Sequence, residues 1–106
     1  MPIRIGFTQQ REELIEEDLQ RITQALPQLG VSKAIRTDIG DPDSTLRLVF
    51  VMSVDWPFVR RPDFFYSHLM PQVGADFIVY TPEEFDKITT GNTPLSSAIR
   101  RGQVLA

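Results

Sequence analysis

The side chains that could bind a metal ion or a phosphate group are concentrated between Arg36 and Arg47. Asp38, Asp41 and Asp43 lie together in this stretch, and Asp55 and Asp63 follow the apolar segment 45–54. Carboxylates suit Mg²⁺, but this ion demands a fixed octahedral geometry that a loose loop rarely supplies. Aspartate is also a common turn residue, because its side chain hydrogen-bonds to the nearby backbone. We therefore favour turn formation for these residues and keep a metal site rebuilt from them as the alternative.

Nucleophilic catalysis has little support in this sequence. The chain has no cysteine, which excludes cysteine nucleophiles and thiolate zinc sites, and its one histidine, His68, excludes a two-histidine metal site. Ser44 could act as a nucleophile in principle, but the single histidine lies on a separate element, so a serine triad is not supported. His68 follows Phe64, Phe65 and Tyr66 in a predicted helix, which favours a packed or surface role over catalysis.

A candidate interaction surface is the aromatic segment, residues 56–66. Its members are Trp56, Phe58, Arg60, Arg61, Phe64, Phe65 and Tyr66. One interpretation is a loop and helix packed over a sheet, because two or three such rings would fill much of a small core. The other is an interface, because aromatic residues and arginine are enriched at interface cores. Under the second interpretation, part of the segment is an exposed apolar patch that becomes covered in an assembly.

Apolar periodicity and capping residues predict the elements that position these side chains. Helices are expected at 8–29, 63–70, 82–90 and 93–102, and strands at 31–36, 45–54, 75–80 and 104–105. Strand 45–54 is apolar on both faces in its middle, which places it at the centre of a sheet. Thr81 and Glu84 form a capping-box pattern that fixes the start of one helix. The order predicts one α/β (α+β) domain over residues 1–106, with a small mixed sheet flanked by helices.

Residues 75–85, ADFIVYTPEEF, resemble a stretch of the minimal nucleotidyltransferases of the DNA polymerase beta superfamily. There, a strand that carries an aspartate runs directly into a Thr-Pro-Glu-Glu helix. Residues 95–105 are similar to that family's closing helix and terminal strand, and the turn at 40–44 with the strand after it resembles the part that bears the family's motif. The resemblance implies a Gly-Ser turn against phosphate groups. It also implies two aspartates one residue apart, with a third carboxylate, holding magnesium and a nucleoside triphosphate.

This chain departs from that pattern at the residues that carry the chemistry. Thr45 and Arg47 stand at the two aspartate positions, and Asp76 alone remains as the third carboxylate. The Gly-Ser position falls near Arg36 and Thr37. Two of three metal ligands are therefore missing, and an arginine adds a fixed cation.

A phosphate-binding loop remains possible on four residues of the same region. They are Arg36, Thr37, Gly40 and Ser44.

Strand alternation places Thr45 and Arg47 on one face, which in the family fold points toward Asp76. We therefore expect the Arg47 guanidinium to lie against the Asp76 carboxylate and to replace the metal cation. The alternative is that the long Arg47 side chain extends into solvent.

Composition and charge limit the partners. The chain has 106 residues, 11 basic and 14 acidic, with a net charge of −3, which makes broad nucleic-acid binding unlikely. No apolar run suits a membrane helix and no signal peptide is evident, so we expect no membrane partner and a cytoplasmic location.

Two functions follow as hypotheses. The first is a nucleotidyltransferase-like binding or regulatory protein that has lost catalysis, needs no cofactor and contacts a small helical protein or a second copy. The resemblance implies such a partner, because these proteins are often encoded in two-gene toxin–antitoxin modules. The alternative is an active nucleotidyltransferase with relocated ligands, which would use Mg²⁺ and a nucleoside triphosphate. A structural domain without a ligand is the third class.

Overall fold

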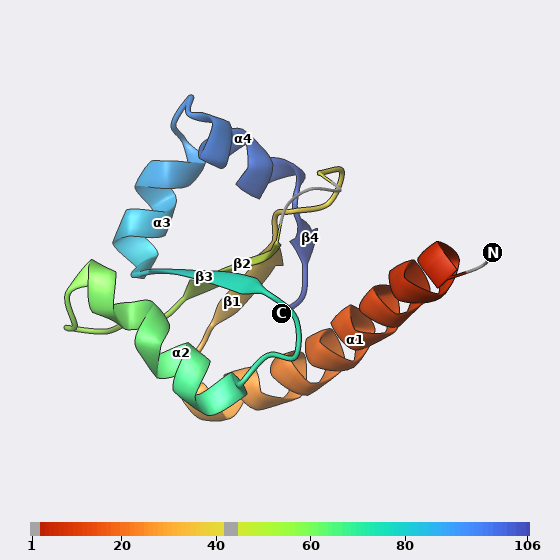
Figure 1. The fold of residues 1–106 in the computed structure, drawn as a ribbon. Helices are drawn as coiled ribbons and strands as arrows, with labels where there is room; N and C mark the ends of the chain where they lie inside the picture. Colours follow the sequence, from red (N-terminus) through yellow and green to blue (C-terminus); the bar gives the residue numbers. More distant parts are fainter. Residues whose placement is uncertain (1–2, 42–44) are drawn as a thin grey trace.

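Within residues 3–41 and 45–106, which the computed structural model describes, the chain forms a four-stranded mixed sheet with helices on both faces (Figure 1). The strands are β1 (Lys33–Arg36), β2 (Leu46–Val51), β3 (Ala75–Tyr80) and β4 (Gln103–Val104). Their order across the sheet is β3-β2-β1-β4. β1 is antiparallel to both β2 and β4, whereas β2 and β3 are parallel. The predicted mixed α/β class is confirmed.

Strand β2 lies inside the sheet, as its apolar sequence predicts. Leu48, Val49 and Phe50 are completely buried although they alternate between the two faces. This burial is possible because β2 has a neighbour on each side and helices above and below it. A strand at an edge would expose its backbone and one or both of its faces.

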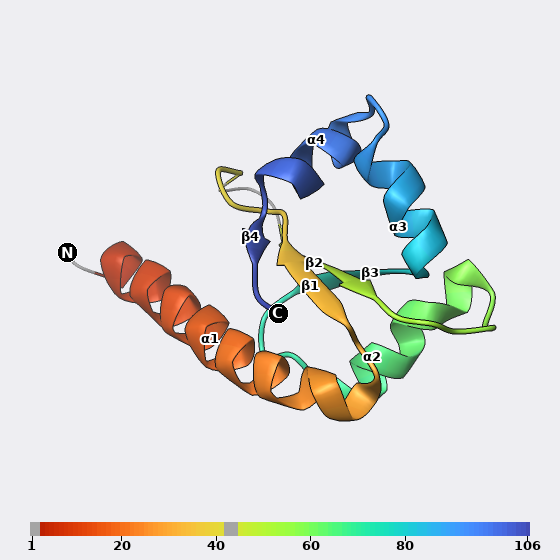
Figure 2. The ribbon, with the colours of Figure 1, turned by 180° about the vertical axis from the view of Figure 1, so that it is seen from behind.

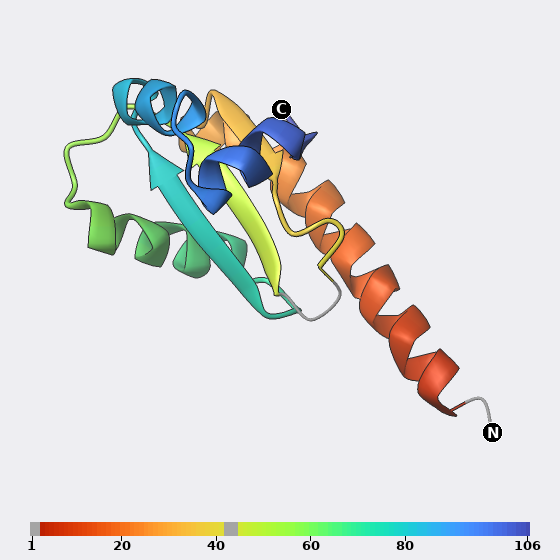
Figure 3. The same cartoon turned by 90° about the horizontal axis from the view of Figure 1, so that it is seen from above.

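Two pairs of helices cover the sheet. One face carries α1 (Ile3–Ala25) and α2 (Arg61–Leu69), and the other carries α3 (Pro82–Thr89) and α4 (Pro94–Arg101) (Figures 2 and 3). The larger core layer, under α1 and α2, includes Ile22, Leu26, Leu48, Phe50, Phe65, Leu69 and Phe77. The smaller layer, under α3 and α4, consists of Ile35, Val49, Val51, Phe85 and Ile99.

Local sequence signals explain how most of these elements begin and end. The Thr81 hydroxyl accepts the Glu84 backbone N–H, and the Glu84 carboxylate accepts the Thr81 N–H, so the predicted capping box is formed. Thr93 caps α4 in a related way by accepting the N–H of Ser96. Gly30 ends the 3-10 turn Leu26–Leu29 in the left-handed conformation, with φ of 83°.

The largest departure from the predicted boundaries is at α1. It begins at Ile3 rather than at residue 8, because Thr8 continues the helix instead of capping it. Its first half extends away from the sheet in Figure 3. At its other end the helix tightens into a 3-10 turn at Pro27, whose missing N–H cannot continue the α-helical pattern. No helix in the described part of the chain is long and apolar enough to cross a membrane.

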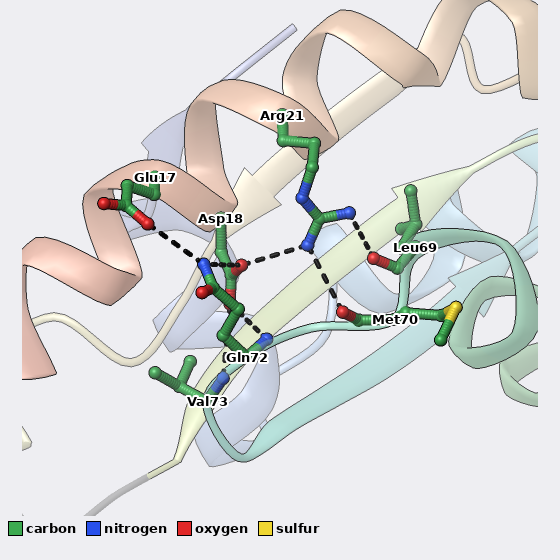
Figure 4. A network of polar contacts seen from close by, with 7 residues as sticks. All are labelled: Glu17, Asp18, Arg21, Leu69, Met70, Gln72 and Val73. Atoms are coloured by element: carbon green, nitrogen blue, oxygen red, sulfur yellow. Dashed lines mark hydrogen bonds and ion pairs between the residues drawn. The ribbon is translucent and has the colours of Figure 1, made fainter.

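A completely buried carboxylate, Asp18, holds the last turns of α1 against the loop between α2 and β3 (Figure 4). Its Oδ2 accepts the backbone N–H groups of Gln72 and Val73, at 2.8 Å and 3.3 Å. Its Oδ1 accepts hydrogen bonds from the Gln72 side-chain amide and from the Arg21 guanidinium. Arg21 also donates to the carbonyl oxygens of Leu69 and Met70, which closes the network onto the end of α2.

These contacts decide the ionisation of Asp18. Burial raises the pKa of its carboxyl group, but the hydrogen bonds from Gln72, Arg21 and Val73 outweigh burial and hold the pKa below its ordinary value. The folded protein therefore prefers the carboxylate. Its contribution to stability is complete above the pKa of the unfolded chain and is lost as the pH falls through the folded-state pKa.

We predict that Asp18→Asn lowers the free energy of unfolding by about 1–3 kcal/mol near neutral pH, because an amide nitrogen would face N–H donors. The difference from the unchanged protein should shrink in acid, where Asp18 itself becomes protonated. Urea unfolding of both proteins across this pH range measures it. Glu13→Gln, which removes an exposed charge from the same helix, is the matched control and should change little. Equal effects of the two substitutions would contradict the role assigned to Asp18.

Candidate functional site

The position where the resemblance places a metal ion lies where β2 and β3 begin. Arg47 and Asp76 are register partners of these two parallel strands. The Thr45 hydroxyl donates a hydrogen bond of 2.7 Å to Asp76 Oδ2. Thr45 and Asp76 are both exposed, and Arg47 is half-buried. The structure thus brings together the three residues named from the sequence, but with a threonine–aspartate contact at their centre.

The predicted ion pair between Arg47 and Asp76 is wrong. Among the described residues, no carboxylate forms an ion pair with Arg47, although its Cα lies opposite that of Asp76. The Arg47 side chain instead lines surfaces formed with Ala98 and Leu95 of α4. Register fixes the position of a Cα atom, but a side chain as long as arginine can reach along the sheet face to another element.

Among the described residues named for this position, Asp76 is the one carboxylate, and its Oδ2 accepts the hydrogen bond from Thr45. No group of three or more histidine, cysteine, aspartate or glutamate residues that could hold a metal ion occurs in the described part of the chain. Asp43 and Ser44 lie outside the described residues.

The loop after β1 is organised by the carboxylate of Asp38. Arg36 donates to both of its oxygens, from Nε at 3.1 Å and from Nη2 at 3.2 Å, and the Arg47 backbone N–H donates at 3.0 Å. Asp38 is 8% exposed, and burial raises its pKa, but the Arg36 hydrogen bonds and charge and the Arg47 N–H lower that pKa below its ordinary value. The prediction that aspartates in this region form turns is consistent with the Asp41 N–H bonding to the Asp38 carbonyl.

Beside this loop lies a cavity of about 420 Å³ that we call the arginine pocket. Its lining residues are Arg36, Thr37, Ile39, Gly40, Asp41, Arg47, Ala98, Arg101 and Gly102. Three of the four residues predicted as a phosphate loop, Arg36, Thr37 and Gly40, therefore lie together. Gly40 has φ of 92°, a left-handed conformation that glycine adopts without strain.

The pocket also contains residues that the sequence reasoning missed, Arg101 and Gly102. Gly102 is where the chain leaves α4 and passes β1, and a Cβ there would lie 2.4 Å from the Ile35 side chain and 2.8 Å from the Arg36 carbonyl oxygen. Glycine is thus required for this close approach. In the sequence, Arg101 and Gly102 indicated only the end of a helix. The neighbouring residues gave no sign that this helix end packs beside residue 36.

One residue that lines the pocket, Thr37, has a buried hydroxyl without a hydrogen-bond partner. Thr37 is 9% exposed, and its Oγ1 forms no hydrogen bond with any described residue. Buried hydroxyl groups are normally hydrogen-bonded, so this one is an exception that requires an explanation.

The aromatic segment divides into exposed and buried residues. Trp56, Phe58 and Tyr66 are 41%, 46% and 38% exposed, so part of the segment is an exposed apolar surface. Arg60 is also exposed, and Phe64 is half-buried against Trp56, with ring centroids 5.0 Å apart. The other predicted interface residues behave differently.

Phe65 and Arg61 belong to the interior, in contrast to the prediction that they line an interface. Phe65 is completely buried and lies 4.8 Å from Phe50 between ring centroids. Arg61 is 6% exposed, forms an ion pair of 2.6 Å with Glu84, and donates to the carbonyl of Val79. Because Glu84 is also the capping-box residue, Arg61 joins the start of α2 to the start of α3. The hydrogen bond that Arg61 donates to the Glu84 carboxylate is the main reason why the pKa of Glu84 is lowered.

His68 has the surface role that the sequence favours. It is exposed, its ring lies 4.1 Å from that of Phe64, and its Nδ1 is 2.8 Å from the Phe64 carbonyl oxygen.

Comparison of the chain with protein-family models, with curated proteins and with solved structures finds no match. The resemblance to minimal nucleotidyltransferases therefore remains a prediction from the sequence, and the geometry of the site must support any functional proposal.

We predict that Asp38→Asn destabilises the protein by about 1–3 kcal/mol near neutral pH, because Arg36 loses its charged partner. The carboxylate contributes fully above the unfolded-state pKa, so the destabilisation should diminish as the pH falls through the lower folded-state pKa. Thermal unfolding over this range measures the effect. Asp55→Asn, at an exposed aspartate, is the control. A pH-independent loss of stability would show that the charge of Asp38 is not what matters.

Proposed function

We propose that this protein is a nucleotidyltransferase-like binding or regulatory domain that acts through protein contacts and transfers no nucleotide. The observation that carries the absence of nucleotide transfer is the hydrogen bond from Thr45 to Asp76. It occupies an oxygen of the one carboxylate that the resemblance leaves for a metal ion. Magnesium bound there would also lie close to the strand position of Arg47, a permanent cation.

The exposed apolar side chains support the proposed action through protein contacts. Among the described residues, Trp56, Phe58, Val59, Tyr66 and Met70 are large hydrophobic side chains exposed by 38% to 80%. They are all contributed by α2 and the segments that flank it. Exposed aromatic and aliphatic groups gathered in one part of a surface are typical of a protein interface. A second copy, or the small helical protein that the resemblance implies, is the partner we propose.

We predict that the unchanged protein shows no specific binding of Mg²⁺ or of magnesium ATP at millimolar concentrations in isothermal titration calorimetry. The double substitution Thr45→Asp with Arg47→Asp should create magnesium binding, because it completes a three-carboxylate set with Asp76. Thr45→Asn with Arg47→Gln removes the same arginine without adding carboxylates, and should bind no magnesium.

Two results would contradict the loss of catalysis. One is magnesium-dependent ATP binding by the unchanged protein that Asp76→Asn abolishes. The other is transfer of a labelled nucleotidyl group by the unchanged protein to itself or to RNA.

The surface is tested by its effect on assembly. We predict that Phe58→Ser with Val59→Ser weakens association at least about tenfold, because it removes apolar area from the contact. Sedimentation measures association of the chain with itself, and with any small helical protein encoded beside it. Val104→Ser, at a side chain that is 67% exposed on β4, is the control. A chain that remains a monomer and whose complex is insensitive to residues 58 and 59 would contradict the proposal.

A further inference from the structure

We propose that the arginine pocket binds a phosphate group, free or carried by a small organic molecule, without a metal ion. This inference goes beyond the protein contacts proposed above and does not depend on them. It rests on the arrangement of two arginines, one buried hydroxyl and a cavity.

Two arginines reach the pocket from separate elements. Arg47 is the second residue of β2, and Arg101 ends α4. Chain segments distant in sequence thus bring two cationic residues to the lining of one cavity, although the chain as a whole has a net charge of −3. Such convergence of like charges is unfavourable unless an anion compensates for it.

The carboxylates of the described residues balance these cations only in part. Asp38 binds the Arg36 guanidinium through Nε and Nη2 on the other face of the sheet, where Arg36 pairs with Leu48, so this pair is neutral by itself. Asp41 is the one acidic residue among the described residues that line the cavity. One positive charge therefore remains in excess over the side chains of Asp41, Arg47 and Arg101.

The guanidinium groups of Arg47 and Arg101 retain hydrogen-bond donors. No described residue forms a hydrogen bond or ion pair with the Arg47 guanidinium, and Arg101 makes one contact, from Nε to the Ser97 carbonyl at 3.3 Å. Arginine presents its donors as a planar fork that matches the oxygens of phosphate.

Thr37 is the independent observation that points to a ligand. The residue lines the cavity, and its hydroxyl is buried and has no hydrogen-bond partner among the described residues. A hydroxyl can donate to an anion while the arginines hold it, and a phosphate oxygen would satisfy this group.

The cavity also indicates the size of the ligand. Its volume of about 420 Å³ falls within the range of about 300–1,000 Å³ found for small-molecule sites. Ile39 and Ala98 add apolar surface to the lining. The pocket therefore has room for an organic group attached to the phosphate, and its arginines make a bridging magnesium ion unnecessary.

The test is an NMR titration of the ¹⁵N-labelled full chain with inorganic phosphate and with phenyl phosphate, in EDTA and at constant ionic strength. Saturable shifts are expected at the backbone amides of Gly40, Ala98 and Gly102 and at the Arg47 side chain. Tighter binding of phenyl phosphate would indicate that the phosphate is carried by an organic group, and equal binding would indicate free phosphate.

Substitutions then assign the donors. Arg47→Gln and Arg101→Gln should each weaken binding about tenfold or more, and Thr37→Val should weaken it several-fold. Arg60→Gln removes an exposed arginine outside the pocket and should leave the affinity unchanged.

Three results would overturn the proposal. They are the absence of saturable shifts in the unchanged protein, shifts that map away from the pocket, and equal weakening by Arg47→Gln and Arg60→Gln. The first two need no variant, so they decide the question even if a substitution prevents folding.

Discussion

The carboxylate of Asp38 joins the end of β1 to the start of β2, and the geometry of the candidate site depends on it. It accepts hydrogen bonds from the Arg36 side chain and from the Arg47 backbone within one buried contact. Because β1 and β2 run antiparallel, this contact holds residues 36–38 beside the Arg47 backbone at the start of β2. The same loop carries Thr37 and Gly40 into the arginine pocket.

Two other charged side chains also join separate elements of the fold. Asp18 joins α1 to the loop before β3, and Arg61 joins α2 to α3 through Glu84. Each is almost or completely buried and finds its partners within the chain. Arg47 differs from them, because no carboxylate among the described residues pairs with it. The buried charged groups among the described residues, Asp18, Asp38 and Arg61, are thus paired internally, which makes the half-buried Arg47 a reasonable place to look for an external partner.

Local sequence signals predicted the fold well and the site only in part. The apolar run around Phe50 correctly indicated a central strand, and Thr81 with Glu84 correctly marked a helix start. Alternation placed Thr45 and Arg47 on one strand face, and the resemblance pointed that face toward Asp76, which the Thr45 hydroxyl does contact. It could not predict the direction of the Arg47 side chain, because rotamers of a long side chain depend on contacts distant in sequence. Arg101 was missed for the same reason: only the folded chain brings the end of α4 to β1.

The central claim, which rests on the proposed function, is that the Thr45–Asp76 contact lies where the resemblance to nucleotidyltransferases places a metal ion. Titration of the unchanged protein with Mn²⁺, observed through paramagnetic broadening of backbone amide signals, tests it directly. The structure predicts no selective broadening at Thr45, Arg47 and Asp76 beyond that of other exposed carboxylates. Strong, saturable broadening centred on these three residues would contradict the claim.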